Sequence, residues 1–199
     1  MVRHGATAVL VLVLAASGAA DQRYRRQEAD QFEAKLARIV EQGKAVPRGA
    51  AAPRTTQVME REVNAYFQHH AKDDIPVGIV DPVISALGDG RLSGRATVDL
   101  DAARKQQPRG WMDPMGYLTG RLPVTATGTL TTKAGIGRFT LETVEISGVA
   151  VPKSLLQELV SYYSKTPENP AGFKIDDPFE LPSGIREIRV GKAQATVVQ

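Results

Sequence analysis

The sequence contains no cysteine among its 199 residues. Disulfide bonds, thiolate metal sites and a lipidated N-terminal cysteine are therefore excluded. A chain of this length can fold without disulfides, but its packed core then has to supply the stability alone.

Residues that could act as a catalytic nucleophile or base are also scarce. There is no Gly-x-Ser-x-Gly nucleophile elbow, and after His4 the only histidines are His69 and His70. No glycine-rich segment is followed by the lysine that a phosphate-binding loop needs. The carboxylate pair Asp176-Asp177 lies in a predicted turn, where aspartate is expected for turn geometry. We therefore predict a protein that is not an enzyme and that uses no cofactor.

Neither sign of charge is in clear excess, because the sequence has 25 basic and 22 acidic residues and a formal charge of +3. Nucleic-acid-binding domains gather basic residues on one face, so this even balance argues against that class of partner. Weak attraction to an anionic surface remains compatible with the charge.

Only the N-terminus carries a long apolar run. Arg3 and His4 precede the unbroken apolar segment Ala8–Ala16, and Ser17–Ala20 supplies small residues. This layout is typical of a secretory signal peptide, and the run is shorter than the ~20 residues that a membrane-spanning helix needs. We therefore expect residues 1–20 to be removed and the remaining chain to be exported to the periplasm or cell envelope.

Two helices are predicted before the first strands. Residues 21–44 form a helix whose apolar side chains fall on one face: Phe32, Leu36, Ile39 and Val40. Residues 45–53 are rich in alanine, glycine and proline, which is typical of a linker. The second helix is predicted to begin at a cap formed by Thr55 or Thr56, with Met59, Val63, Tyr66 and His70 on one face, and to stop at Pro76.

In much of the remaining chain, apolar and polar residues alternate in the pattern of β-strands. Val77–Leu87 is interrupted by Pro82, which predicts an edge or bulged strand, and Asp89-Gly90 predicts a hairpin turn after it. A second hairpin is predicted to turn at Lys133–Gly135, with a bulge near Glu142-Thr143.

A third helix is predicted to open at Pro152, and a last hairpin to turn at Gly191-Lys192. Together these elements predict an α+β fold in which a curved antiparallel sheet is wrapped on one or two helices. We expect a single domain over 55–199, preceded by the helix and linker of 21–54.

Two clusters of residues are candidates for a role other than core packing, one as a metal site and one as a membrane contact. His69-His70 with Asp73-Asp74 contains metal-ligand residue types, but adjacent helical residues point about 100° apart. His70 then continues the apolar face while His69 faces water, so no metal site is predicted. The second cluster is a loop with large apolar residues among glycines and prolines, which are expected either to contact a membrane or to fold back over the core: Trp111, Met112 and Met115.

From Thr55 onward the chain resembles the LmeA-like phospholipid-binding and YpmS-like groups of exported bacterial proteins. The resemblance rests on four segments: Glu62-Val63-Asn64-Ala65-Tyr66, Gly90–Gly94 with Val98-Asp99-Leu100, Ile146–Pro152 running into Leu155-Leu156, and Phe179–Pro182 with Gly184-Ile185. It implies a curved sheet wrapped on a helix around an apolar groove, similar to half of a tubular lipid-binding module. Helix 21–44 and the Trp111 loop are not features of these groups.

The leading hypothesis is therefore an exported, non-enzymatic binder of an apolar ligand, a lipid above all. The predicted groove is lined by residues of two strands, their flanks and the third helix: Val98, Leu100, Phe139, Leu141, Leu156, Leu159 and Tyr163. The alternative is a structural or protein-interaction module of the envelope, in which the apolar face of helix 21–44 docks a protein partner.

Overall fold

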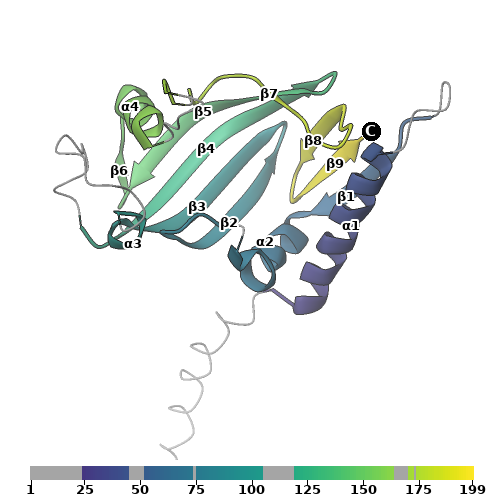
Figure 1. Cartoon of the computed structure of the whole chain (residues 1–199), viewed down its shortest axis with the longest axis horizontal. Helices are drawn as coiled ribbons and strands as arrows, with labels where there is room; N and C mark the ends of the chain where they lie inside the picture. Colours follow the sequence, from purple (N-terminus) through teal and green to yellow (C-terminus); the bar gives the residue numbers. More distant parts are fainter. Residues whose placement is uncertain (1–23, 45–51, 74, 105–118, 164–169, 173) are drawn as a thin grey trace, which may run out of the picture.

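The structure is a computed structural model that describes residues 24–44, 52–73, 75–104, 119–163, 170–172 and 174–199 (Figure 1). The described helices are α1 (Arg26–Lys44), α2 (Glu60–His69), the short 3₁₀ helix η1 (Ala71–Asp73), α3 (Leu100–Arg104) and α4 (Lys153–Tyr163). The described strands are β1 (Thr55–Met59), β2 (Ile79–Gly88), β3 (Arg91–Asp99), β4 (Arg121–Lys133), β5 (Ile136–Ile146), β6 (Val149–Ala150), β7 (Phe179–Glu180), β8 (Glu187–Gly191) and β9 (Gln194–Val198).

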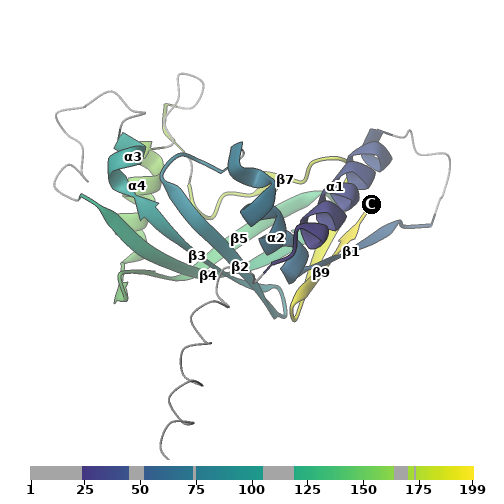
Figure 2. The same cartoon turned by 90° about the horizontal axis from the view of Figure 1, so that it is seen from below.

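The larger of two antiparallel sheets has the order β2-β3-β4-β5-β6, with β7 added along β5. Its two long hairpins turn where the sequence predicts. Asp89 and Gly90 adopt φ of 53° and 80°, and Ala134 and Gly135 adopt 51° and 84°, the left-handed values that a two-residue hairpin turn requires. Figure 2 shows the sheet curved, with α2 and α4 on the same side of it. The α+β class with an N-terminal helix is confirmed, and the sheet does not close on itself.

Both predicted irregularities in the large sheet are present. β2 forms the edge of the sheet and its pairing with β3 shifts between Val80 and Val83, around Pro82. In β5 the extra residue is Glu142, because Thr127 pairs with Thr143 while Gly128 pairs with Leu141. Each bulge adds local twist, which contributes to the curvature of the sheet.

The smaller sheet, of order β1-β9-β8, corrects one prediction. Thr55 and Thr56 do not cap a helix. They begin β1, which pairs with β9 from Thr55 opposite Val198 to Met59 opposite Gln194. The physical reason is burial on one face, since Thr56 and Val58 are each 7% exposed while their neighbours are exposed.

Helix α2 therefore begins later than predicted, at Glu60, and the side chain of Glu62 caps its N-terminal end. The Glu62 carboxylate accepts a hydrogen bond of 2.9 Å from the Met59 N–H, which would otherwise lack a partner at the helix end. The same carboxylate pairs with Lys35 of α1 at 2.6 Å. One buried glutamate thus both starts α2 and binds it to α1.

Side chains of α2 also cover the exposed edge of the large sheet. The Asn64 side chain donates to the Ile84 carbonyl oxygen and accepts from the Ile84 N–H, both at 2.8 Å. Glu60 accepts the Ala86 N–H at 2.7 Å. An uncovered edge strand leaves such backbone groups unpaired, and here two polar side chains take the place of a neighbouring strand.

Helix α1 packs against the small sheet and α2 (Figure 1). Its Ile39 is 5% exposed and lies in a core with Val58, Ile185 and Val197, and Phe32 packs against that core. The Gln199 side chain donates to the Ile39 and Ser183 carbonyl oxygens at 2.9 and 2.6 Å, which fixes the end of the chain to α1. The helix face predicted to dock a partner therefore lies largely against the protein itself.

None of the helices in the described ranges is long and apolar enough to span a membrane. The predicted signal peptide, residues 1–20, and most of the predicted linker, residues 45–51, lie outside the described part of the chain.

We predict that Asn64→Ala lowers the free energy of unfolding by about 2–4 kcal/mol, because it leaves the Ile84 N–H and carbonyl without partners at a buried site. Urea unfolding monitored by circular dichroism measures the change. Gln68→Ala, one turn along the same helix, is the matched control and should cost under about 1 kcal/mol. Equal losses in the two variants would show that the edge is not held by Asn64.

Candidate functional site

One face of the large sheet is continuously apolar. The register of the strands determines which residues share this face. Val98 pairs with Leu122, Ala96 with Val124, and Val124 with Ile146. Ala126 pairs with Val144, and Leu130 with Phe139, on the same face. The opposite face is polar, as in the pairs Ser93–Thr127, Arg95–Thr125 and Thr129–Thr140. We call the face that carries Val98, Leu122, Val124 and Leu130 the apolar face.

Most large side chains of the apolar face are only half-buried by the described residues. Leu122, Val124, Leu130 and Ile146 are all of intermediate exposure, whereas the buried residues of the small-sheet core are between 5% and 9% exposed. Ordinary core strands would bury such residues against a second layer. Here the main contacts of the described helices with the large sheet are those of α2 along β2, of α4 along β5 and of the short α3 with β4.

Three of the predicted groove residues lie on this face, each half-buried: Val98, Phe139 and Leu141. Val98 lies beside Leu122 and Phe139 beside Leu130, toward opposite ends of β4. Leu100 starts α3 and is 8% exposed, so it is a core residue with little surface for a ligand. Leu156 lies half-buried on α4. Leu159 and Tyr163 also belong to α4, but their side chains lie outside the described residues.

Two glycines of the apolar face are covered by phenylalanine rings. A Cβ on Gly128 would lie 2.5 Å from the Phe139 ring, and one on Gly137 would lie 2.6 Å from the Phe179 ring. Only glycine permits such close approach, and the ring then covers the bare backbone. Phe179 remains 44% exposed and extends the apolar surface to the rim formed by β7.

A hollow of about 550 Å³ adjoins this face where β2 is bulged. Its wall combines apolar residues such as Phe67, Ile75 and Ile79 with the polar Gln68 and Lys72. Ile79, the partner of Val98 in the sheet, lies on the side of the apolar face, whereas Val80 and Val83 pair with Thr97 and Arg95 of the polar face, so the hollow lies at the edge of the sheet and borders the apolar face at Ile79. Its volume lies in the range of small-molecule sites, which are mostly apolar with a few polar groups.

Sequence reasoning missed this hollow, although two local signals mark it. Pro82 interrupts the strand, and Asp81 adopts a φ of 50°, which is rare for a residue other than glycine. Both features move the start of β2 away from a regular ladder and leave space beside α2.

A second hollow, of about 330 Å³, lies between α1 and the small sheet. It is lined by apolar side chains, including Leu36, Val40, Ile188 and Ala195. Gly43 approaches the Ser183 backbone closely at one end of it, so that a Cβ there would collide with the Ser183 carbonyl. This hollow separates helix and sheet within the core around Ile39 and does not adjoin the apolar face.

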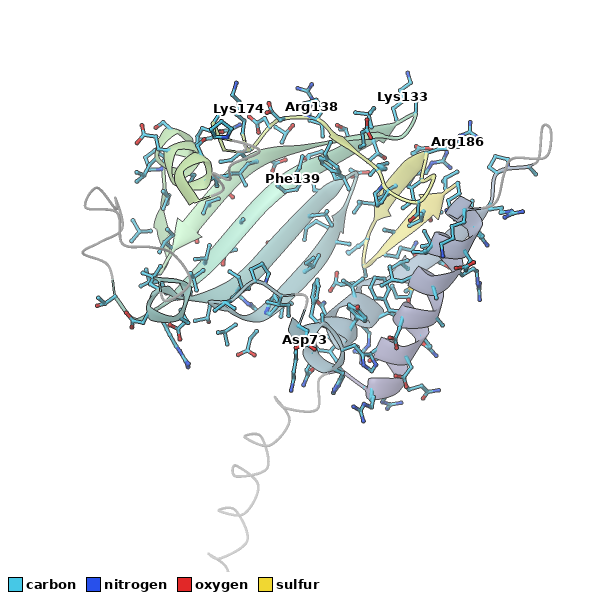
Figure 3. The ribbon with its side chains drawn as sticks, in the orientation of Figure 1. Asp73, Lys133, Arg138, Phe139, Lys174 and Arg186 are labelled. Atoms are coloured by element: carbon cyan, nitrogen blue, oxygen red, sulfur yellow. The ribbon has the colours of Figure 1, made fainter. Side chains whose placement is uncertain are left out.

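Exposed cations follow the rim of the sheet beside β5. Figure 3 shows Lys174, Arg138 and Lys133 along this margin and Arg186 at the start of β8. Within the described residues none of the four has an ion-pair partner, although the carboxylates of Asp177 and Glu180 lie on nearby segments. By contrast, Asp176 is paired with Lys153, which lowers the pKa of its carboxyl group.

The remaining predicted sites have different outcomes. Trp111, Met112 and Met115 lie outside the described residues, so membrane contact through their loop stays a prediction. His69 was expected to face water, but its Nε2 lies 3.0 Å from the Tyr24 carbonyl oxygen. His70 lies beside Tyr66, with 6.0 Å between ring centroids, in agreement with its predicted place on the apolar side of α2.

No protein family matches the chain, and no match was found among curated proteins or solved structures. The resemblance to the LmeA-like and YpmS-like groups therefore stays a prediction, and function has to be argued from the site itself.

Proposed function

We propose that the protein is an exported, non-enzymatic binder of a lipid, and that the acyl chain lies on the apolar face of the large sheet. The observation that supports this most directly is the row of half-buried aliphatic and aromatic side chains on that face, from Val98 and Leu122 to Phe139. An apolar surface that folding has not fully covered is characteristic of a binding site.

The size of the surface suits an acyl chain. Each methylene group removed from water gains ~0.8 kcal/mol, so about ten methylenes are enough for micromolar affinity before the costs of binding. The hollow beside β2 borders the apolar face at Ile79, the partner of Val98, and Lys72 offers a cation at its wall. We therefore place an anionic lipid head in this hollow, beside the end of the apolar face.

The cations of the opposite rim and the Trp111 loop favour transient contact with a membrane. Lys133, Arg138, Lys174 and Arg186 face solvent, and each cation near an anionic lipid surface contributes ~1 kcal/mol. A soluble carrier in the envelope needs such contact to exchange its cargo. The predicted signal peptide supports export to that compartment.

The alternative function, a protein-interaction module that uses α1, has less support. Ile39 is 5% exposed and Phe32 packs against the same core, so a partner would have to displace α1 from its own domain. Val40, at 42% exposed, is the large apolar side chain that α1 leaves exposed within the described residues. We therefore favour the lipid-binding function.

We predict that Val98→Asp weakens binding of a fluorescent fatty acid at least tenfold, because it places an unpaired carboxylate against the acyl chain. Thr97→Asp is the matched control, since the adjacent residue lies on the polar face of the same strand, and it should bind as the native protein does. Both variants are compared by titration after circular dichroism has shown that they are folded. Equal affinity in Val98→Asp and native protein would contradict the proposed site.

We further predict that the fluorescence of Trp111, the only tryptophan, shifts to the blue when anionic vesicles are added. The emission in buffer should be close to that of a solvated indole, and vesicles of neutral phosphatidylcholine should have a smaller effect. A spectrum that is already blue in buffer and does not respond to either vesicle would place Trp111 in a core and remove the loop from the membrane contact.

A further inference from the structure

Three metal-ligating side chains converge where α1 meets the end of α2. Asp30 and Glu33 lie one turn apart on α1, and His70 follows the last residue of α2. Ligand atoms of the three side chains all lie within 4.8 Å of one another, and His70 Nε2 is 2.8 Å from an Asp30 carboxylate oxygen. The residues are far apart in the sequence, and only the packing of the two helices brings them together.

The His70 ring is positioned by a ring contact with Tyr66 and by its hydrogen bond to Asp30. Its side chain is 20% exposed, its ring lies beside Tyr66, and Tyr66 in turn makes an edge contact with Phe32 of α1. The ring nitrogen Nε2 therefore points toward α1 from a position that is set by core packing. Asp30, 60% exposed, and Glu33, also exposed, can adjust their carboxylates toward that nitrogen.

The arrangement concentrates negative charge. Two carboxylates one helical turn apart repel each other, and like-charge pairs at this spacing destabilise a helix. A divalent cation would remove that repulsion and use the imidazole nitrogen as well. One nitrogen and two carboxylate oxygens, with a position left for water, is a donor set that suits zinc, whereas magnesium and calcium prefer oxygen ligands alone.

We propose that Asp30, Glu33 and His70 bind one Zn²⁺ ion, which joins α1 to α2. The consequence is structural, because α2 carries Asn64 and Glu60, the side chains that cover the edge of the large sheet. An ion at this junction stabilises the contact on which the position of α2 depends. The site lies apart from the apolar face, so it does not require the proposed lipid-binding function.

The test is zinc titration of the EDTA-treated full chain, by isothermal calorimetry and thermal unfolding. Binding of one ion is expected, with a rise in Tm of about 3–5 °C at zinc tenfold above its Kd. The expected rise is lost in His70→Gln and in the double variant Asp30→Asn with Glu33→Gln. His69→Gln and Asp73→Asn, neighbours outside the cluster, should keep it, and magnesium should not reproduce it.

The two groups of variants also keep the test independent of folding. The changes at Asp30 and Glu33 are isosteric and lie at the surface, so the metal-free variants should give the circular dichroism spectrum of the native protein. No heat of binding and no rise in Tm with zinc up to about 1 mM would overturn the site. An equal rise in His70→Gln, or with magnesium, would also overturn it. Fatty-acid binding measured in EDTA reports separately on the lipid site.

Discussion

The contacts made by three polar side chains at the start of α2 hold the parts of this molecule together. Asn64 pairs with both backbone groups of Ile84, and Glu60 accepts the Ala86 N–H, which ties the helix to the edge of the large sheet. The Glu60 N–H donates to Ala193 of the small sheet, and Glu62 pairs with Lys35 of α1. Buried hydrogen-bonded groups of this kind are costly to leave unpaired, so they tie α1 and α2 to the sheets. The two sheets are also joined directly, for example by the Ala193 N–H to the Ala86 carbonyl oxygen and the Ile188 N–H to the Thr132 hydroxyl.

This arrangement places α2 at one margin of the large sheet, and the described part of α4 contacts β5. The strands between them alternate aliphatic and threonine-rich positions, so one face of the sheet is apolar and one polar. In a protein that only needed a core, a second layer would cover the apolar face. The proposed binding surface thus follows from where the helices attach.

The sequence predicted the features that depend on neighbouring residues. Asp89-Gly90 marked a hairpin, Pro82 an irregular edge strand and Pro152 the start of α4, because each has a local conformational cause. It failed at Thr55, where local chemistry favours a helix cap but the residue pairs with Val198 at the other end of the chain. The convergence of His70 with Asp30 likewise depends on helix packing, which no local pattern contains.

For the proposed binding site, strand alternation was sufficient to identify Val98, Phe139 and Leu141 as sharing a face. It was not sufficient for Leu100, because the chain turns into α3 at that residue and buries it. The hollow beside β2 was also beyond sequence reasoning, since it depends on how far α2 stands from the bulged strand.

The most direct test of the central claim, that the apolar face carries a lipid, is native mass spectrometry of the protein purified from its host without detergent. We predict a population heavier than the processed polypeptide by the mass of one lipid, which is released on activation in the gas phase. Protein that is consistently free of such an adduct, and that also fails to take up added fatty acid, would contradict it.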